Sequence, residues 1–121
     1  MTQDKELLLK DLCARLPYGV KVLVDNKHWI DFDGRTPSKL TFDNSYRLLY
    51  VGTDLGYVKP YLFPLSSMTE EQKSQYSFFL TRIIDGYDSS LLIDWLNKNH
   101  FDYRGLIPKG LAIDATGLDI Y

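Results

Sequence analysis

The segment NHFDYRGLIPKGLAIDA, residues 99–115, concentrates polar side chains of several chemical types in a short stretch. Its apolar residues and two glycines suffice to form a turn that packs on a core. The polar residues are not needed for that packing, and a loop can present them on one surface. The alternative is a buried turn in which Arg104 pairs with Asp102 or Asp114. We predict a partner-binding patch made of His100, Asp102, Tyr103, Arg104 and Lys109.

Two of these residues also have the types and spacing of metal ligands. His100 and Asp102 could bind an ion together with Asp94 or Asp114. A histidine near the C-terminal end of a helix, however, more often interacts with the free carbonyl groups there. Because no second histidine stands at helical spacing from His100, we predict no metal site and no cofactor.

Nucleophilic catalysis would need a cysteine or serine beside a base. The single cysteine, Cys13, falls on the apolar side of a predicted helix, where we expect it to be buried, and the histidines are His28 and His100. The chain contains no G-x-S-x-G, G-x-x-x-x-G-K-[ST] or G-x-G-x-x-G motif. Asp31 and Asp33 share one side of a predicted strand, but acidic residues beside a turn are usually solvated. We predict no catalytic residue and no enzymatic activity.

The composition indicates one globular domain over residues 1–121. The hydrophobic fraction is 45% and the charged fraction 25%, which are ordinary values for such a domain. A net charge of -2 and a pI near 5.6 provide no strong positive field, so nucleic acid is disfavoured as a partner. A single cysteine is typical of a reducing compartment, and no apolar stretch has the length of a membrane span. We therefore expect a cytoplasmic protein that does not bind membranes.

Helical spacing of apolar residues occurs near both ends of the chain. It predicts one helix from Asp4 to Arg15 and one over about 88–100. Between them it predicts a helix that begins at a capping box, for which both Ser67 with Glu70 and Thr69 with Gln72 have the required spacing. The residues expected to be buried in the last two helices are Tyr76, Phe79, Leu80, Ile83, Leu91, Leu92, Trp95 and Leu96.

Between these helices the apolar residues alternate as in strands. Residues 20–24 and 29–33 predict a hairpin, 39–42 a short strand and 46–52 the strongest strand. The stretch 56–65 contains two prolines, which cannot donate to a ladder, so we assign it to an edge strand or a crossing loop. The predicted fold class is α+β, with an N-terminal helix, an antiparallel meander of three to five strands and two C-terminal helices packed on one face.

Three blocks of sequence carry a resemblance to a known group of proteins. They are KDLCARLPYGVKV (10–22), VKPYLFPLSSMTEEQ (58–72) and DWLNKNHFDYRGLIPKGLAIDA (94–115), and together they cover about half of the chain. These blocks resemble small hypothetical proteins encoded in prophages and mobile elements of Bacteroides-type bacteria. The resemblance implies a cytoplasmic accessory protein of a phage or mobile element, and it implies no established activity.

The leading hypothesis for function is a non-catalytic accessory protein that binds a host or phage protein. A nucleic-acid-binding factor is the first alternative, and a small hydrolase is the second. A cavity that holds His100 with two or more acidic residues would favour the hydrolase. The sequence identifies neither the partner nor the oligomeric state. The nucleic-acid alternative would be favoured if one face gathered Lys10, Lys21, Arg47, Lys59, Arg104 and Lys109.

Overall fold

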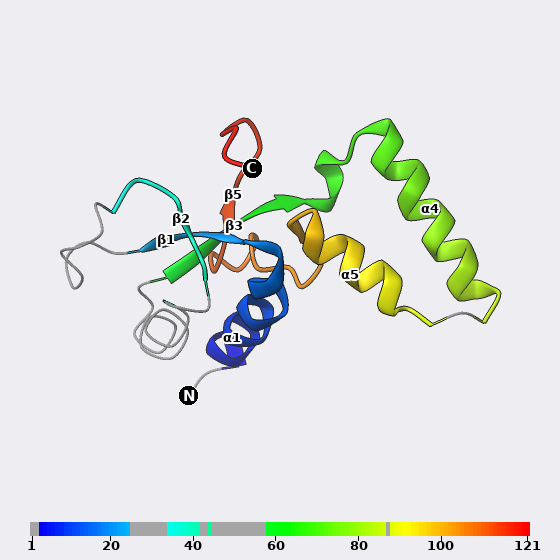
Figure 1. Cartoon of the computed structure of the whole chain (residues 1–121), viewed down its shortest axis with the longest axis horizontal. Helices are drawn as coiled ribbons and strands as arrows, with labels where there is room; N and C mark the ends of the chain where they lie inside the picture. The colour runs from blue at the N-terminus through cyan, green and yellow to red at the C-terminus, as the bar shows by residue number, and fades with distance from the viewer. Residues whose placement is uncertain (1–2, 25–33, 42–43, 45–57, 87) are drawn as a thin grey trace.

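The structure, a computed structural model, describes residues 3–24, 34–41, 44, 58–86 and 88–121. This part of the chain contains three α-helices and a five-stranded sheet, which confirms a mixed helix and sheet fold. In chain order the elements are α1 (Gln3–Arg15), η1 (Leu16–Tyr18), β1 (Lys21–Val24), β2 (Ser38–Lys39), β3 (Val58–Pro64), η3 (Leu65–Ser67), α4 (Glu70–Ile84), α5 (Ser90–Lys98), β4 (Phe101–Asp102) and β5 (Ile113–Asp114) (Figure 1).

β3 is the strand on which the sheet is assembled. β1 pairs with it antiparallel, with Leu23 opposite Lys59, and β2 pairs antiparallel with β1. β4 and β5 both pair with β3 in parallel, so the sheet is mixed and the predicted antiparallel meander is wrong in this respect. Parallel pairing needs a long crossover, which α4 and α5 supply between β3 and β4.

Two prolines stand inside β3, which is neither the edge strand nor the crossing loop that we predicted. Backbone groups of successive residues point to opposite edges of a strand. Phe63 N–H donates to the backbone just before β4 (2.8 Å), whereas the Leu62 carbonyl accepts from Ala115 N–H just after β5 (2.8 Å). Pro60 and Pro64 are two residues away from Leu62 on either side, so their backbone groups face the same edge as those of Leu62. The N–H groups that the two prolines lack are therefore missing from that edge and not from the edge that carries the Phe63 donor.

α1 buries a mixed stripe of apolar and charged residues. Asp11 and Leu12 stand three and four residues after Leu8, and Arg15 stands four and three residues after them, so the four share one side of the helix and all are buried. Cys13 is exposed, so its predicted burial is wrong: the stripe passes through its neighbour Leu12, about 100° away around the helix. The main core consists of Leu8, Leu12, Val20, Val22, Val24, Leu40, Val58, Leu62, Leu106 and Ala112.

α4 begins at the second of the two predicted capping boxes, that of Thr69 and Gln72. The Thr69 hydroxyl accepts from Gln72 N–H (3.2 Å), and the Gln72 side chain accepts from Thr69 N–H (2.9 Å). This reciprocal pair is the capping box, which is therefore confirmed. The helix ends before Gly86, whose φ of 96° is a left-handed conformation that glycine adopts readily.

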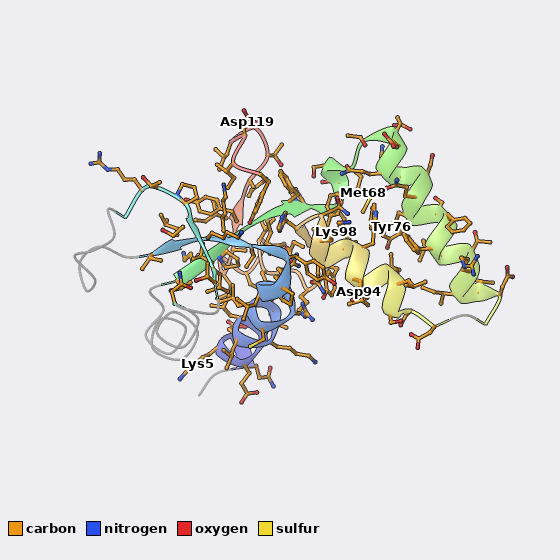
Figure 2. The ribbon with its side chains drawn as sticks, in the orientation of Figure 1. Lys5, Met68, Tyr76, Asp94, Lys98 and Asp119 are labelled. Atoms are coloured by element: carbon orange, nitrogen blue, oxygen red, sulfur yellow. The ribbon has the colours of Figure 1, made fainter. Side chains whose placement is uncertain are left out.

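α4 and α5 form a second apolar cluster beside the main core. Leu92, Leu96, Phe101 and Met68 are its buried members, and Tyr76 projects from α4 into the space between the two helices (Figure 2). α5 packs on β4 and α1, whereas α4 packs mainly on α5 and projects away from the sheet (Figure 1). The predicted packing of both helices on one face of the sheet is therefore met only in part.

The predicted burial of these two helices also needs correction. No residue of α4 is fully buried, although Phe79 and Ile83 are half-buried in the cluster. Leu80 is 38% exposed and Leu91 is 61% exposed, so both lie outside the core. Among the described elements α4 contacts mainly one helix, α5, and one neighbour does not cover so broad an apolar stripe.

Several sequence predictions fall on other parts of the chain. β1 confirms the strand expected at 20–24, and β2 lies at the start of the one expected at 39–42. The predicted strands at 29–33 and 46–52 lie outside the described residues, as do His28 and Arg47.

A tyrosine hydroxyl joins β1 to β3 where their ladder ends. The register of the two strands would next place Lys21 opposite Tyr61. The hydroxyl group of Tyr121 instead accepts from Lys21 N–H (2.8 Å) and donates to the Tyr61 carbonyl (2.8 Å). Tyr121 therefore acts as a bridge between the two strands.

Removing this hydroxyl tests the bridge. We expect Tyr121→Phe to lower the free energy of unfolding by about 1–2 kcal/mol, because a backbone donor and a backbone acceptor lose their partner. Urea denaturation measures the change. Tyr18→Phe is the matched control, since the Tyr18 hydroxyl bonds to no described residue. Equal losses in the two variants would show that the bridge contributes nothing.

Candidate functional site

A buried carboxylate connects the segment 99–115 to the first helix. Asp11 and Arg15 are both 0% exposed, and Arg15 Nε donates to Asp11 Oδ2 (2.9 Å). Arg104 Nη1 donates to the other oxygen, Asp11 Oδ1 (2.8 Å), from a side chain that is 15% exposed. Arg15 Nη2 also donates to the Phe101 carbonyl in β4. Asp11 is therefore paired with two guanidinium groups, one of them from the distant end of the chain.

Tyr103 lies against both arginines of this network. The guanidinium carbons of Arg104 and Arg15 are 4.5 Å and 5.3 Å from the centre of its ring, within the range of cation–π contacts. Its hydroxyl group donates to Oδ1 of Asn97, a buried residue of α5 (3.0 Å). Tyr103 therefore ties α5 to the charged network on α1.

Asp102 organises the turn that follows β4. Its two carboxylate oxygens accept from Leu106 N–H (2.9 Å) and Ile107 N–H (2.9 Å), and the residue is 7% exposed. The turn passes through Gly105 with φ of 74°, as the predicted role of the glycines requires. The carboxylate is thus committed to the backbone of its own loop.

His100 is buried in a strained conformation. Its φ is 62°, which is uncommon for a residue with a side chain, and it is 8% exposed. The ring stacks on Tyr121 with 3.7 Å between centroids and 14° between planes. Burial, reinforced by the positive charges of Arg15 and Lys21, lowers the pKa of His100 to about 4. The imidazole is therefore neutral near pH 7, and its Nδ1 atom has no hydrogen-bond partner.

Lys109 is the most exposed of the five residues in the predicted patch. Its ammonium group is 3.6 Å from Asp4, and both side chains are about half exposed. His100 and Asp102 are buried and Arg104 is paired with Asp11, so the five residues do not form one exposed surface. The ion pair that we considered for Arg104 is present, but its partner is Asp11 in place of Asp102 or Asp114. A binding role for the set stays a prediction.

A groove between α4 and α5 exposes apolar side chains that the sequence analysis did not select. One hollow of about 350 Å³ is lined by Ser74, Gln75, Phe78, Phe79 and Trp95. A second, of about 160 Å³, is lined by Phe79, Arg82, Ile83, Asp88, Ser90, Leu91 and Leu92. Phe79 lines both hollows, and we refer to the two together as the α4–α5 groove.

The walls of the groove combine exposed and anchored rings. Phe78 is 57% exposed and lies 5.4 Å from the guanidinium carbon of Arg82. Trp95 stacks on Phe101 with 5.6 Å between centroids, and its indole N–H donates to Gln75 Oε1 (3.2 Å). The Trp95 ring is therefore held in place, while Phe78 projects toward solvent. One signal in the sequence could have revealed this: Phe78 is apolar but stands outside the predicted buried stripe of its helix.

Comparisons with known proteins identify no relative. No protein-family model, curated protein or solved structure matches the chain. Among the described residues, no three histidine, cysteine or acidic side chains gather as metal ligands would. The helices of this part of the chain include none with the length and apolarity of a membrane span. Function is therefore inferred from geometry.

The buried network predicts a graded series of stability losses. We expect Asp11→Asn to lower the free energy of unfolding by about 3–5 kcal/mol, because Arg15 would keep a buried charge without its carboxylate. Arg104→Ala should cost less, since Asp11 retains Arg15. Lys109→Ala, at a half-exposed pair, should change stability by less than about 1 kcal/mol. Urea denaturation gives the order, and a loss for Lys109→Ala equal to that for Asp11→Asn would contradict it.

The neutral state of His100 predicts a stability that depends on pH. Between about pH 6.5 and pH 4 the unfolded chain binds a proton at His100 that the folded chain does not bind, so stability falls as pH falls. The slope contributed by one histidine is at most about 1.4 kcal/mol per pH unit. His100→Asn should remove this contribution, because asparagine does not titrate and tolerates a left-handed φ. Parallel pH profiles for the two proteins, measured by urea denaturation, would argue against a buried neutral imidazole.

Proposed function

We propose that this protein is a non-catalytic interaction module whose α4–α5 groove receives an amphipathic helix of a partner protein. The observation that carries the proposal is that α4, with fifteen residues, has no buried residue, while the groove beside it exposes Phe78 and Leu91. Exposed apolar side chains that line hollows of this kind are typical of protein interaction sites.

Burial of the groove would be energetically favourable. Fully burying a phenylalanine or leucine side chain gains about 1.5–3 kcal/mol, and Phe78 and Leu91 are each more than half exposed. Trp95 is already oriented by its hydrogen bond to Gln75 and its stack on Phe101, so binding would order few additional atoms. An aromatic residue held in this way is characteristic of interface hot spots.

The shape of the groove favours a helix over other partners. α4 and α5 are joined by a short connection and run in opposite directions (Figure 1), so the groove follows two roughly aligned helices. Side chains of a third helix fill such a groove by ridge-into-groove packing. The partner would present apolar residues at i, i+3 or i+4, and i+7.

An accessory role in a phage or mobile element, which the sequence resemblance implies, agrees with a protein that acts by binding. The two alternatives receive less support. In the described part, Arg104 pairs with the buried Asp11 and Lys21 donates to a backbone carbonyl, so these two cations take part in the fold, whereas Lys109 pairs with Asp4 at the surface. A hydrolase of the kind considered would need acidic side chains beside His100. The residues that line the cavity next to His100 include none.

Substitutions in the groove test the proposal. Phe78→Ser and Leu91→Ser should each remove the proteins that co-purify with the tagged chain from its native host, as quantified by mass spectrometry. The melting temperatures should change little, because both side chains are largely exposed. Ile84→Ser is the matched control: Ile84 is 84% exposed but lines neither hollow of the groove.

Two results would count against this function. The first is loss of the same partners from Ile84→Ser, which would indicate nonspecific apolar adsorption. The second is self-association of the purified protein, measured as mass by light scattering, that Leu91→Ser abolishes. This result would mean that a second copy of the chain occupies the groove.

A further inference from the structure

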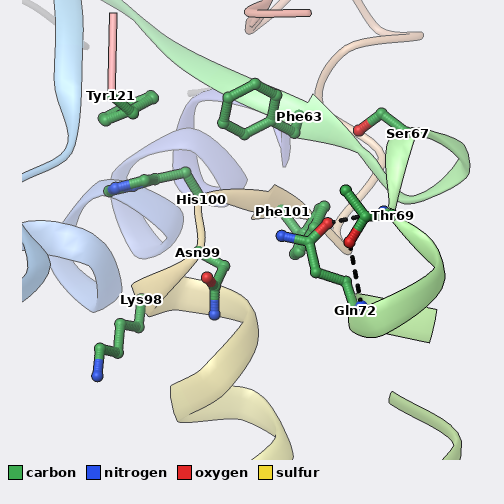
Figure 3. A pocket seen from close by; sticks show the side chains of 9 residues that line it. All are labelled: Phe63, Ser67, Thr69, Gln72, Lys98, Asn99, His100, Phe101 and Tyr121. Carbon is green, nitrogen blue, oxygen red and sulfur yellow. Dashed lines mark hydrogen bonds between the residues drawn. The ribbon is translucent and has the colours of Figure 1, made fainter. Parts of the chain in front are cut away.

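The cavity beside His100 and the α4–α5 groove differ in what they offer a binding partner. The cavity has a volume of about 470 Å³, and Figure 3 shows the stacked rings of His100 and Tyr121 on one side and the capping box of α4 on the other. Tyr121 covers one face of the His100 ring, and Lys98 points away from the rings. The apolar side chains of Phe78 and Leu91, each more than half exposed, line the groove and not the cavity. The groove is therefore the surface whose geometry specifies a partner in more detail.

The two hollows of the groove are about one helical turn apart. On α4, Phe78 lines the larger hollow, and Arg82, four residues later, lines the smaller one. On α5, Trp95 lines the larger hollow, and Leu91, four residues earlier, lines the smaller one. Four residues span about 6 Å along a helix, so the two antiparallel helices give the same separation. A partner helix that lies along the groove would therefore reach the two hollows with side chains at i and i+4.

The two hollows differ in size and in the chemistry of their walls. The larger one, of about 350 Å³, is lined by three aromatic rings and by no charged side chain among the described residues. The centroids of Phe78 and Trp95 lie 6.1 Å and 5.9 Å from that of Phe79, so an aromatic side chain placed here would meet both edges and faces of rings. The smaller one, of about 160 Å³, has aliphatic walls from both helices and suits a short aliphatic side chain.

The charged side chains of the groove lie at its smaller hollow, which Arg82 and Asp88 line. The guanidinium carbon of Arg82 is 5.4 Å from the centre of the Phe78 ring, so this cation packs on the groove itself. Asp88 Oδ1 accepts from Ser90 N–H (2.7 Å), but the carboxylate forms no ion pair with a described residue. Asp88 precedes Leu91, on the side away from the larger hollow. A cation of the partner, beyond the small aliphatic side chain, would complement this carboxylate.

We infer that the partner helix presents three side chains in a fixed order along the groove. An aromatic residue fills the larger hollow, a small aliphatic residue four positions away fills the smaller one, and a lysine or arginine about one turn further faces Asp88. This inference rests on the proposed function, because it describes the helix that the α4–α5 groove would select. The asymmetry of the groove, with aromatic walls at one end and a carboxylate at the other, would discriminate among helices of equal apolar content.

Synthetic helical peptides test this pattern without knowledge of the natural partner. The reference peptide, of about 18 residues and stapled on its outer side to hold the helix, carries tryptophan, valine and lysine at successive four-residue intervals among alanine and glutamine. A spacing peptide moves the valine by two positions, a size peptide replaces the valine with tryptophan, and a charge peptide replaces the lysine with glutamate. Fluorescence anisotropy of each labelled peptide, titrated with the purified full chain, gives the dissociation constants.

We expect the reference peptide to bind most tightly of the four. The spacing peptide should bind about tenfold more weakly, because a shift of two positions carries the valine about 200° around the helix and out of the groove. The size peptide should lose about fivefold, since a second tryptophan overfills the smaller hollow. The charge peptide should lose about threefold, and added salt should reduce that difference.

Protein variants assign each preference to a residue. Leu91→Ser should bring the affinities of the reference and spacing peptides together, and Asp88→Asn should do the same for the reference and charge peptides. Asparagine retains an oxygen that can accept from Ser90 N–H, so the start of α5 is preserved. Asp94→Asn is the matched control, since Asp94 is an exposed acidic residue of α5 that lines neither hollow.

Three outcomes would overturn the inferred pattern. They are the absence of saturable binding of the reference peptide at about 1 mM protein, equal affinities for the reference and spacing peptides, and a preference for lysine that survives Asp88→Asn. If Phe78→Ser and Leu91→Ser nevertheless remove the partners that co-purify from the host, only the pattern of side chains is wrong and the proposed function stands. If co-purification is unchanged as well, the proposed function fails together with the pattern.

Discussion

The buried carboxylate of Asp11 is the constraint on which the arrangement of this protein depends. It lies on α1, which packs on the main core, and it binds Arg15 from its own helix and Arg104 from the loop after β4. A buried charge is costly unless it is paired, so the folded state requires the loop after β4 to contact α1. Arg15 extends the same network to the Phe101 carbonyl and thereby fixes β4 relative to α1. The polar residues between β4 and β5 therefore serve first as the connection between two ends of the chain.

This constraint explains which features could be predicted from sequence. The capping box at Thr69, the helix that ends at Arg15 and the turn glycines were predictable, because each depends on residues a few positions apart. The partner of Arg104 lies 93 positions away, and nothing in local spacing distinguishes Asp11 from other acidic residues. The central position of β3 does not follow from its prolines, because whether a proline removes a donor from the ladder depends on the strand's orientation, which only the pairing partners determine.

The same reasoning applies to the candidate sites. Polar residue types in 99–115 suggested an exposed patch, yet their polar atoms are mostly used inside the fold, since buried polar groups require partners. His100 is the exception, because its Nδ1 is buried without one. The α4–α5 groove cannot be predicted from polar residues, because the residues that distinguish it, Phe78 and Leu91, are apolar. A helical stripe shows which side chains are apolar, but the number of neighbouring elements decides which of them are covered.

The positions of the groove and the cavity follow from how α4 and α5 connect β3 to β4. The crossover places the end of α5 and the start of α4 beside β3, and the cavity forms there among residues anchored by the sheet and the Asp11 network. Among the described elements α4 contacts mainly α5, and apolar side chains such as Phe78 and Leu91 remain uncovered on the two helices. The cavity therefore lies among elements that the sheet connects, whereas a protein partner at the groove would complete the packing of a helix pair. Trp95 links the two regions, since it stacks on Phe101, which lines the cavity, and itself lines the groove.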